Sequence, residues 1–161
     1  MFNRGAVVGV TGAVALIGPS LSPAVAASHV AHKHRISETG HLANVAHRGK
    51  AGTPSFRLIS AGIFDGKIGS KSISGAIRAS VAFTTPSHNV VHGTEFDVGG
   101  SRRFVIHSHY VVANGIVTER GHGSWTGGTG RYVHARGTFT INGRGPLTGA
   151  VTVRQRGSII Y

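Results

Sequence analysis

Alternating apolar and polar residues run through the C-terminal part of the chain and predict β-strands. One face of residues 102–113 carries Phe104, Ile106, Ser108, Tyr110 and Val112. In residues 132–142 the corresponding face carries Val133, Ala135, Gly137, Phe139 and Ile141. Successive side chains of a strand point to opposite faces of its sheet, so each run has one mostly apolar face and one mostly polar face. This pattern predicts strands that bury one side and expose the other.

Turn signals divide this region into short strands and predict an all-β domain. The predicted strands are residues 56–64, 72–84, 90–98, 102–113, 115–125, 132–142 and 147–161, and a division of the first or the last would make eight. Asn114-Gly115 and Asn142-Gly143 have the composition of two-residue hairpin turns. Asp65-Gly66 is either a third turn or part of a longer strand. We find no convincing 3.6-residue apolar period, so the sequence predicts sequential antiparallel hairpins in an up-and-down barrel or a sandwich.

The first 26 residues have the order of a secretory signal peptide. Arg4 precedes an uncharged apolar stretch, which ends in Pro19 and a run of small residues. Ala24-Val25-Ala26 forms an A-x-A cleavage site, and Val25-Ala26-Ala27 is an alternative. An uncleaved membrane anchor is the other interpretation, but the prolines and glycines make a poor spanning helix. The sequence therefore predicts a secreted, extracellular protein.

Residues 27–54 are predicted to be a flexible, His-rich, basic linker that precedes the folded domain at residues 55–161. The segment has few large apolar side chains and no persistent helical or strand period. It cannot bury enough apolar surface to offset the conformational entropy lost on ordering.

Composition narrows the chemistry that the chain can perform. The 161 residues include no cysteine, which excludes a disulfide framework and a thiol nucleophile. Seventeen Lys and Arg residues oppose five Asp and Glu residues, for a net charge of +12. The basic residues are scattered and do not alternate with aromatic residues, so we expect no specific nucleic-acid partner. For an exported protein, an anionic cell-wall or surface polymer is the more plausible charged partner.

Residues 123–143 resemble the glycine-rich strand–turn–strand of the allene oxide cyclase and dirigent barrel superfamily. The match is Gly127-Gly128-Thr129-Gly130, followed by Tyr132 and then Ala135-Arg136-Gly137. The same motif is similar to that of small secreted bacterial proteins with this domain. The resemblance implies an eight-stranded antiparallel barrel, often oligomeric, with an apolar lumen that can hold a small hydrophobic molecule. No motif here matches the pocket acids and bases of the plant enzymes.

Candidate ligand-binding residues follow from the apolar faces of the predicted strands. A closed barrel turns these faces inward, so we expect Phe104, Ile106, Ser108, Tyr110 and Phe139 to contact a ligand. No residue is assigned a catalytic role, because none of the five carboxylates belongs to a nucleophile motif. Glu95 and Asp97 share one face of a strand and are expected to be exposed.

Histidines provide the candidate metal ligands. If cleavage follows Ala26, the free amine, two amide nitrogens and His29 could form a square-planar site for Cu(II) or Ni(II). His107 and His109 lie on one side of a strand and could bind zinc if His122 or His134 supplied a third ligand. The alternative, which we favour, is that these imidazoles lie on a solvent-facing or subunit-facing surface. The sequence indicates no cofactor.

Three function classes remain open. The favoured hypothesis is a secreted barrel that binds a small hydrophobic ligand, which would be hydroxyl- or carboxylate-bearing with a basic residue near the rim. The second is a structural or surface-adhering barrel with a filled core. The third is a cyclase or isomerase of the allene oxide cyclase type, for which Tyr110, Ser108 or Glu95 would have to supply a polar group in the lumen. Whether the interior of the barrel is hollow or filled distinguishes the ligand-binding hypothesis from the structural one.

The order of charge, apolar stretch and small residues makes a testable prediction about the N-terminus. Protein secreted by the native host should begin at Ala27, or at Ser28 if the alternative site is used. Intact mass measurement of the secreted protein checks this, and a full-length chain that retains Met1 in the cytosol would contradict it.

Overall fold

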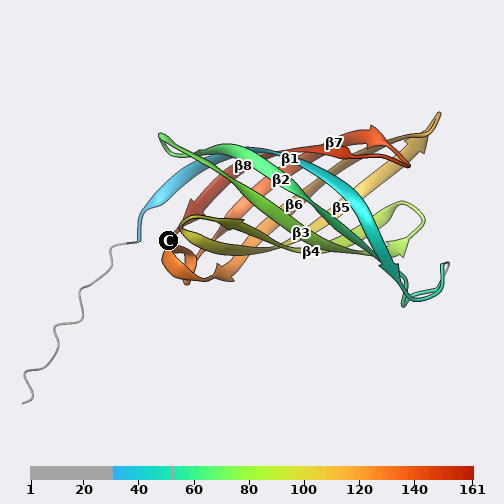
Figure 1. Cartoon of the computed structure of the whole chain (residues 1–161), viewed down its shortest axis with the longest axis horizontal. Coiled ribbons are helices and arrows are strands. Elements are labelled where there is room, and N and C mark those ends of the chain that lie inside the picture. The colour runs from blue at the N-terminus through green and yellow to red at the C-terminus, as the bar shows by residue number, and fades with distance from the viewer. Residues whose placement is uncertain (1–30, 52) are drawn as a thin grey trace, which may run out of the picture.

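The computed structural model describes residues 31–51 and 53–161, which form a closed barrel of eight antiparallel strands (Figure 1). The strands are β1 Lys33–Arg48, β2 Arg57–Ile68, β3 Lys71–Thr85, β4 His88–Asp97, β5 Gly100–Ala113, β6 Ile116–Gly128, β7 Arg136–Pro146 and β8 Val151–Ile160. Each strand pairs with its neighbour in the sequence, and β8 pairs with β1 to close the sheet. The all-β, up-and-down barrel expected from the sequence is confirmed.

The predicted linker at residues 27–54 is wrong over most of its length, because Lys33–Arg48 is the first strand of the barrel. This strand pairs with β2 on one side and with β8 on the other. Its inward positions include Glu38 and Gly40 besides Ile36, so its apolar pattern is weak although both residues are buried. Strand β1 is stabilised by hydrogen bonding on both of its edges and by closure of the barrel, because burial of its few apolar side chains would not be sufficient. The signal peptide predicted for residues 1–26 lies outside the described residues.

Of the turn signals in the sequence, Asn114-Gly115 lies at a hairpin turn as predicted, Asn142-Gly143 does not, and Asp65-Gly66 follows the alternative of a longer strand. Asn114 and Gly115 connect β5 to β6 with φ of 51° and 72°, as the hairpin signal requires. Asn142-Gly143 lies inside β7 and Asp65-Gly66 lies inside β2. At both sites strand pairing on the two edges overrides the local turn preference, and the chain turns several residues later.

The two ends of the barrel differ. At one end of the barrel (Figure 1), the connection from β6 to β7 contains a short 3-10 helix, η1 (Gly130–Tyr132). The Tyr132 side chain is fully buried. Trp125, Phe104 and Phe139 pack edge-to-face or tilted against one another in this half of the barrel. The other end carries the β1–β2, β3–β4, β5–β6 and β7–β8 connections. Side chains therefore fill one half of the barrel.

Val133 is an exception among the residues predicted to point inward. It is 55% exposed, because residues 133–135 form the connection after η1 and β7 begins only at Arg136.

Among the described residues, no helix has the length and apolar character needed to span a membrane.

The Gly127–Gly130 turn makes a prediction about stability. Positive φ is confirmed at Gly127 (100°) and Gly130 (60°). A Cβ at Gly127 would lie 3.2 Å from the flexible end of Arg103 and at an ordinary contact distance of 3.4 Å from the Val133 carbonyl oxygen, whereas a Cβ at Gly128 would lie 1.8 Å from the Ser101 carbonyl oxygen.

Gly127→Ala should therefore cost about 1–2 kcal/mol of unfolding free energy, through φ strain. Gly128→Ala should cost at least about 3 kcal/mol, because a backbone atom cannot move aside easily. Chemical denaturation of the two variants checks this, and equal losses would show that the turn is less tightly fixed than the contacts indicate.

Candidate ligand-binding lumen

A cavity of about 180 Å³ occupies the barrel between the filled half and the open end. Its apolar wall consists of Leu42, Leu58, Ile77, Ala79, Val81, Phe83, Val91, Phe104, Ile106, Val112, Val117, Ile141, Leu147, Val151 and Val153. Ile77 and Ile106 are buried, whereas Val112 and Leu147 are 44% and 54% exposed. The cavity therefore opens to solvent at the end with the β7–β8 connection.

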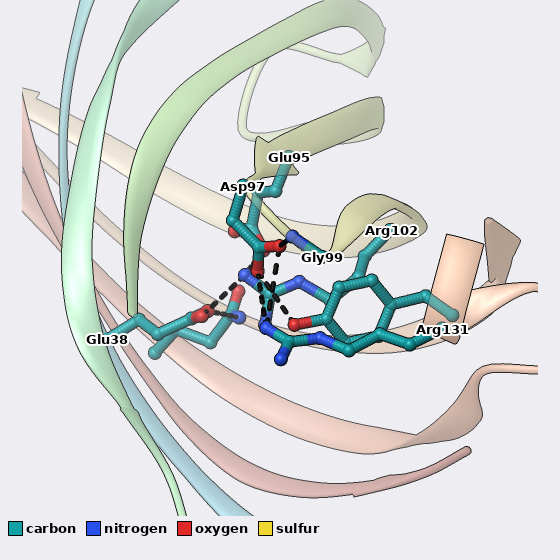
Figure 2. Close-up of polar contacts among 8 residues, drawn as sticks. Glu38, Glu95, Asp97, Gly99, Arg102 and Arg131 are labelled. Carbon is teal, nitrogen blue, oxygen red and sulfur yellow. Dashed lines mark hydrogen bonds and ion pairs between the residues drawn. The ribbon is translucent and has the colours of Figure 1, made fainter. Parts of the chain in front are cut away.

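The inner end of the cavity is a buried ionic cluster drawn from three strands (Figure 2). Arg102 of β5 places one Nη2 nitrogen 2.7 Å from Glu38 Oε1 of β1 and 2.9 Å from Glu95 Oε2 of β4. Gln155 of β8 donates a hydrogen bond to Glu38 Oε2 at 2.7 Å. Glu38, Glu95 and Gln155 line the cavity, whereas Arg102 lies beneath them. We call Glu38, Glu95 and Arg102 the floor cluster.

Aromatic rings surround the guanidinium of the floor cluster. Arg102 is 1% exposed, and its Cζ lies 5.2 Å from the Phe64 ring centroid, 5.2 Å from that of Trp125 and 5.1 Å from that of Tyr132. A buried cation is tolerated when charge partners and π faces replace its lost hydration. Arg102 therefore holds two carboxyl groups together in an apolar environment.

The two carboxyl groups of the floor cluster bind protons more tightly than ordinary glutamates. Burial raises the pKa of Glu95 well above its usual value, and the neighbouring charge of Glu38 raises it further. Burial also raises the pKa of Glu38, although the Arg102 guanidinium opposes this shift. Because two carboxylates face one cation, a single retained proton makes the cluster neutral. We assign that proton to Glu95, whose pKa is raised more.

Asp97 fixes η1 over the floor cluster. Tyr132 Oη donates a hydrogen bond to Asp97 Oδ2 at 2.7 Å, and the Gly99 amide donates to Oδ1 at 2.6 Å. Arg131 Nη2 lies 3.4 Å from Oδ2 (Figure 2). Burial, and then the hydrogen bond to Asp97, raise the pKa of the Tyr132 phenol. The tyrosine therefore remains a neutral donor that closes the barrel.

A second polar group lies on the cavity wall nearer the mouth. Asn89 Nδ2 donates to Glu119 Oε1 at 3.0 Å, and Ser108 Oγ is within hydrogen-bond reach of Asn89 Oδ1 and of Glu119 Oε1. Asn89 and Glu119 line the cavity, and Tyr110 and Asn44 lie on the same lining. We call Asn89, Ser108 and Glu119 the wall cluster.

The residues predicted to bind a ligand lie inside the barrel, but not all of them line the cavity. Phe104, Ile106 and Tyr110 do line it. Ser108 is buried behind the cavity lining in the wall cluster, and Phe139 packs against Trp125 in the filled half. No Lys, Arg or His of the described residues lines the cavity itself. Arg57 lines a neighbouring surface hollow together with Phe83 and Tyr110, which also line the cavity, so a basic residue near the rim stays a prediction.

The metal hypotheses gain no support from the described residues. His107 of β5 pairs directly with His122 of β6 on the exposed outer surface, and His109 is also exposed there. His134 lies in the connection before β7, and the described residues contain no group of three side chains placed to hold a metal ion. His29 lies outside the residues that the structure describes.

Sequence reasoning missed most of the acidic residues in the barrel. Glu95 and Asp97 were expected to be exposed, yet Glu95 is 3% exposed and the Asp97 side chain 2%. The alternation of residues 90–98 could have shown that Glu95 and Asp97 point inward, because they lie on the same strand face as the buried Val91. Glu38 was missed because its strand was assigned to the linker. Arg102, the charge partner of Glu38, is the first residue of the predicted strand 102–113, whose inward face was correctly predicted.

Comparison with known proteins identifies the fold. A pterocarpan synthase dirigent protein has a similar structure, with a TM-score of 0.56 and 16% identity over 88% of this chain and 98% of that chain. A pyocyanin demethylase is similar with a TM-score of 0.38 and 19% identity, over 74% of this chain and 98% of that chain. No family model and no curated protein matches the sequence. The dirigent-like barrel inferred from residues 127–137 is thus confirmed as a fold.

The raised pKa of Glu95 makes a prediction about stability and pH. A group that binds its proton more tightly in the folded state stabilises the fold below its unfolded pKa, and this stabilisation is lost as the pH rises toward the folded pKa. Relative to Glu95→Gln, the wild type should lose about 1.4 kcal/mol of unfolding free energy per pH unit, starting near pH 4.5. Urea denaturation at several pH values checks this. If the unfolding free energies of the two proteins change with pH in the same way, Glu95 is ionised in the folded barrel.

Proposed function

We propose that the protein binds a small, largely apolar ligand in the lumen of its barrel. The observation that carries this proposal is the cavity itself, whose wall is almost entirely aliphatic and aromatic between two polar groups. A concave apolar site with a few convergent polar groups is typical of small-molecule binding sites. The ligand would enter at the end where Val112 and Leu147 are exposed.

The size of the cavity supports a ligand of one or two rings. A cavity of about 150 Å³ lined by apolar side chains is large enough to bind benzene, and this cavity measures about 180 Å³. A purely structural barrel would need no such space, because the side chains of eight strands can fill the interior. Here filling is confined to the half that contains Trp125 and Phe139.

A second candidate function, proton transfer to a bound ligand, is favoured by the floor cluster. Glu95 lines the cavity and has a raised pKa, so it can hold a proton at neutral pH and release it to a ligand oxygen. Arg102, 2.9 Å from Glu95 Oε2, would stabilise the carboxylate that remains. The synthase activity in the name of the similar dirigent protein agrees with such chemistry in this fold, although the likeness itself concerns only the fold.

Filling the cavity should abolish ligand binding. Titration calorimetry with benzyl alcohol and with indole should detect binding to the wild type, and Ile106→Trp should weaken it at least about tenfold, because the indole ring occupies the cavity. Ile63→Trp is the matched control, because Ile63 points outward and is 66% exposed.

No binding by a well-folded wild type would refute ligand binding by molecules of this size and favour the structural alternative. Equal binding by both tryptophan variants would place the ligand outside the lumen.

The proton-transfer candidate makes a separate prediction. The wild type should isomerise a small aromatic epoxide such as styrene oxide. The Glu95→Gln variant should do so at least about a hundredfold more slowly, because an amide cannot supply the proton. Benzyl alcohol binding by the same variant tests whether the cavity is intact. Equal rates for the two proteins would leave Glu95 without a catalytic role.

A further inference from the structure

We infer that the lumen selects ligands with a protonated amine and rejects carboxylates; this inference rests on the proposed ligand binding and specifies its chemistry. The polar groups on the cavity lining include three carboxyl side chains, those of Glu38, Glu95 and Glu119. None of the described Lys, Arg and His residues reaches the lining. A ligand carboxylate would therefore lose its hydration without meeting a cation.

Glu119 is the carboxylate best placed to receive a positive group. The floor cluster already contains its own cation, because Arg102 lies 2.7 Å from Glu38 and 2.9 Å from Glu95. Glu119 forms no ion pair with the described residues, and its hydrogen bonds from Asn89 and Ser108 converge on Oε1. Oε2 faces Gly143 on the inner side of β7, which has no side chain of its own to cover the oxygen, and the nearest neighbouring side chain there is the apolar Val151. This oxygen is free to accept a hydrogen bond from a ligand.

The wall cluster holds Glu119 in position for this contact. Asn89 Nδ2 donates to the carboxylate at 3.0 Å, and Asn89 is 6% exposed. Ser108, 4% exposed, has one hydroxyl proton, which it can donate to Glu119 or to Asn89. An ammonium group at Oε2 would make a charge-assisted hydrogen bond with the Glu119 carboxylate, whose other oxygen is held by the two neutral donors. The apolar remainder of the ligand would contact Ile106 and Ile141.

The test compares three probes with one ring each: benzylamine, benzyl alcohol and benzoate. We expect the wild type to bind benzylamine at least about tenfold more tightly than benzyl alcohol, and benzoate least tightly, as measured by calorimetry at neutral pH. The net charge of +12 would favour benzoate if only long-range attraction acted, so the predicted order cannot arise from overall charge.

Glu119→Gln should remove the preference for benzylamine while benzyl alcohol binds within about threefold of the wild-type affinity. Asp65→Asn is the matched control, because it removes the same charge from an exposed outward position on β2 and should leave the preference unchanged. Binding of benzyl alcohol without a preference for benzylamine would overturn this inference and leave the proposed function intact. A lack of binding by all three probes would instead count against the proposed function.

The outside of the barrel carries a second inference, because acidic and basic side chains are separated across the sheet. Four of the five carboxyl side chains, on Glu38, Glu95, Asp97 and Glu119, belong to the interior, and only that of Asp65 is exposed. Among the described residues, Arg102 is the only buried base, and every other Lys and Arg is exposed except the half-buried Arg57. The described outer surface therefore carries fifteen Lys and Arg side chains against the single exposed carboxyl group of Asp65.

One outer face, formed by β6, β7, β8 and β1, combines these bases with hydroxyl and amide groups. Its outward residues are Thr118, Arg120, His122, Ser124, Thr126, Arg136, Thr138, Thr140, Asn142, Arg144, Thr152, Arg154, Arg156, Ser158, Arg35, Ser37, Thr39 and His41. Arg120 pairs with Asn142, which in turn pairs with Arg154 across neighbouring strands. Arg154 and Arg156 are two residues apart, which corresponds to about 7 Å along the strand. We call this surface the arginine face.

We propose that the arginine face binds a hydroxyl-rich linear polymer with sulfate or phosphate esters. Arginine forms bidentate hydrogen bonds with such groups, and the intervening threonines can bond to hydroxyls of the polymer. The outward residues named above include no aromatic side chain on which a nucleobase could stack.

A matched pair of triple variants tests this proposal on the intact protein. Arg120→Gln, Arg154→Gln and Arg156→Gln together remove three charges from the arginine face, whereas Lys71→Gln, Arg78→Gln and Arg103→Gln remove three from other parts of the surface. At about 0.1 M salt, the first variant should bind dextran sulfate and dextran phosphate at least about tenfold more weakly than the wild type, and the second less than about threefold.

Equal losses in the two variants would show that only net charge matters and would overturn the proposal. Tighter binding of single-stranded DNA or of anionic vesicles, at the same salt concentration, would assign the face to another class of partner. Preference for dextran sulfate or for dextran phosphate identifies whether sulfate or phosphate is the group recognised.

Discussion

The structure depends on one buried cation that joins three strands of the barrel. Arg102 of β5 lies between Glu38 of β1 and Glu95 of β4, at 2.7 and 2.9 Å, and is enclosed by the rings of Phe64, Trp125 and Tyr132. A guanidinium this deep is stable only with both charge partners and π faces in place, and removal of one member leaves an uncompensated buried charge. The cluster therefore fixes the register of strands far apart in sequence and defines the floor of the lumen.

The floor cluster also explains why the barrel is only half filled. Large aromatic side chains surround Arg102 on the side of η1, whereas the side toward the mouth is lined by medium-sized aliphatic residues such as Ile77 and Ile106, which cannot meet across eight strands. The result is a cavity with an ionic floor, an apolar wall and a second polar group at Glu119. Four of the five carboxyl groups lie inside the barrel, and every Lys and Arg of the described residues except Arg102 lies on the outside.

The sequence was most informative where inward residues are apolar. Alternation in residues 102–113 correctly predicted the inward face of β5, and the motif around Gly127–Gly130 predicted the barrel type. It was least informative where the inside is polar: β1 carries Glu38 inward, and its short-range pattern resembles that of a solvated linker. The burial of Glu95 could not be expected from its own residue type, because it depends on Arg102 and Glu38, which only the closed barrel brings together. Asn142-Gly143 shows the same limit, since pairing with β6 and β8 overrides a local turn preference.

The measurement that tests the account most directly is the location of a bound ligand by methyl NMR. Ile77, Ile106 and Ile141 line the cavity, whereas Ile63 is an outward isoleucine on the same barrel. Titration of the folded protein with benzyl alcohol should shift the methyl signals of the three lining isoleucines in a saturable way and leave those of Ile63 unchanged. Saturable shifts at Ile63 with none at Ile77, Ile106 and Ile141 would contradict a ligand-binding lumen.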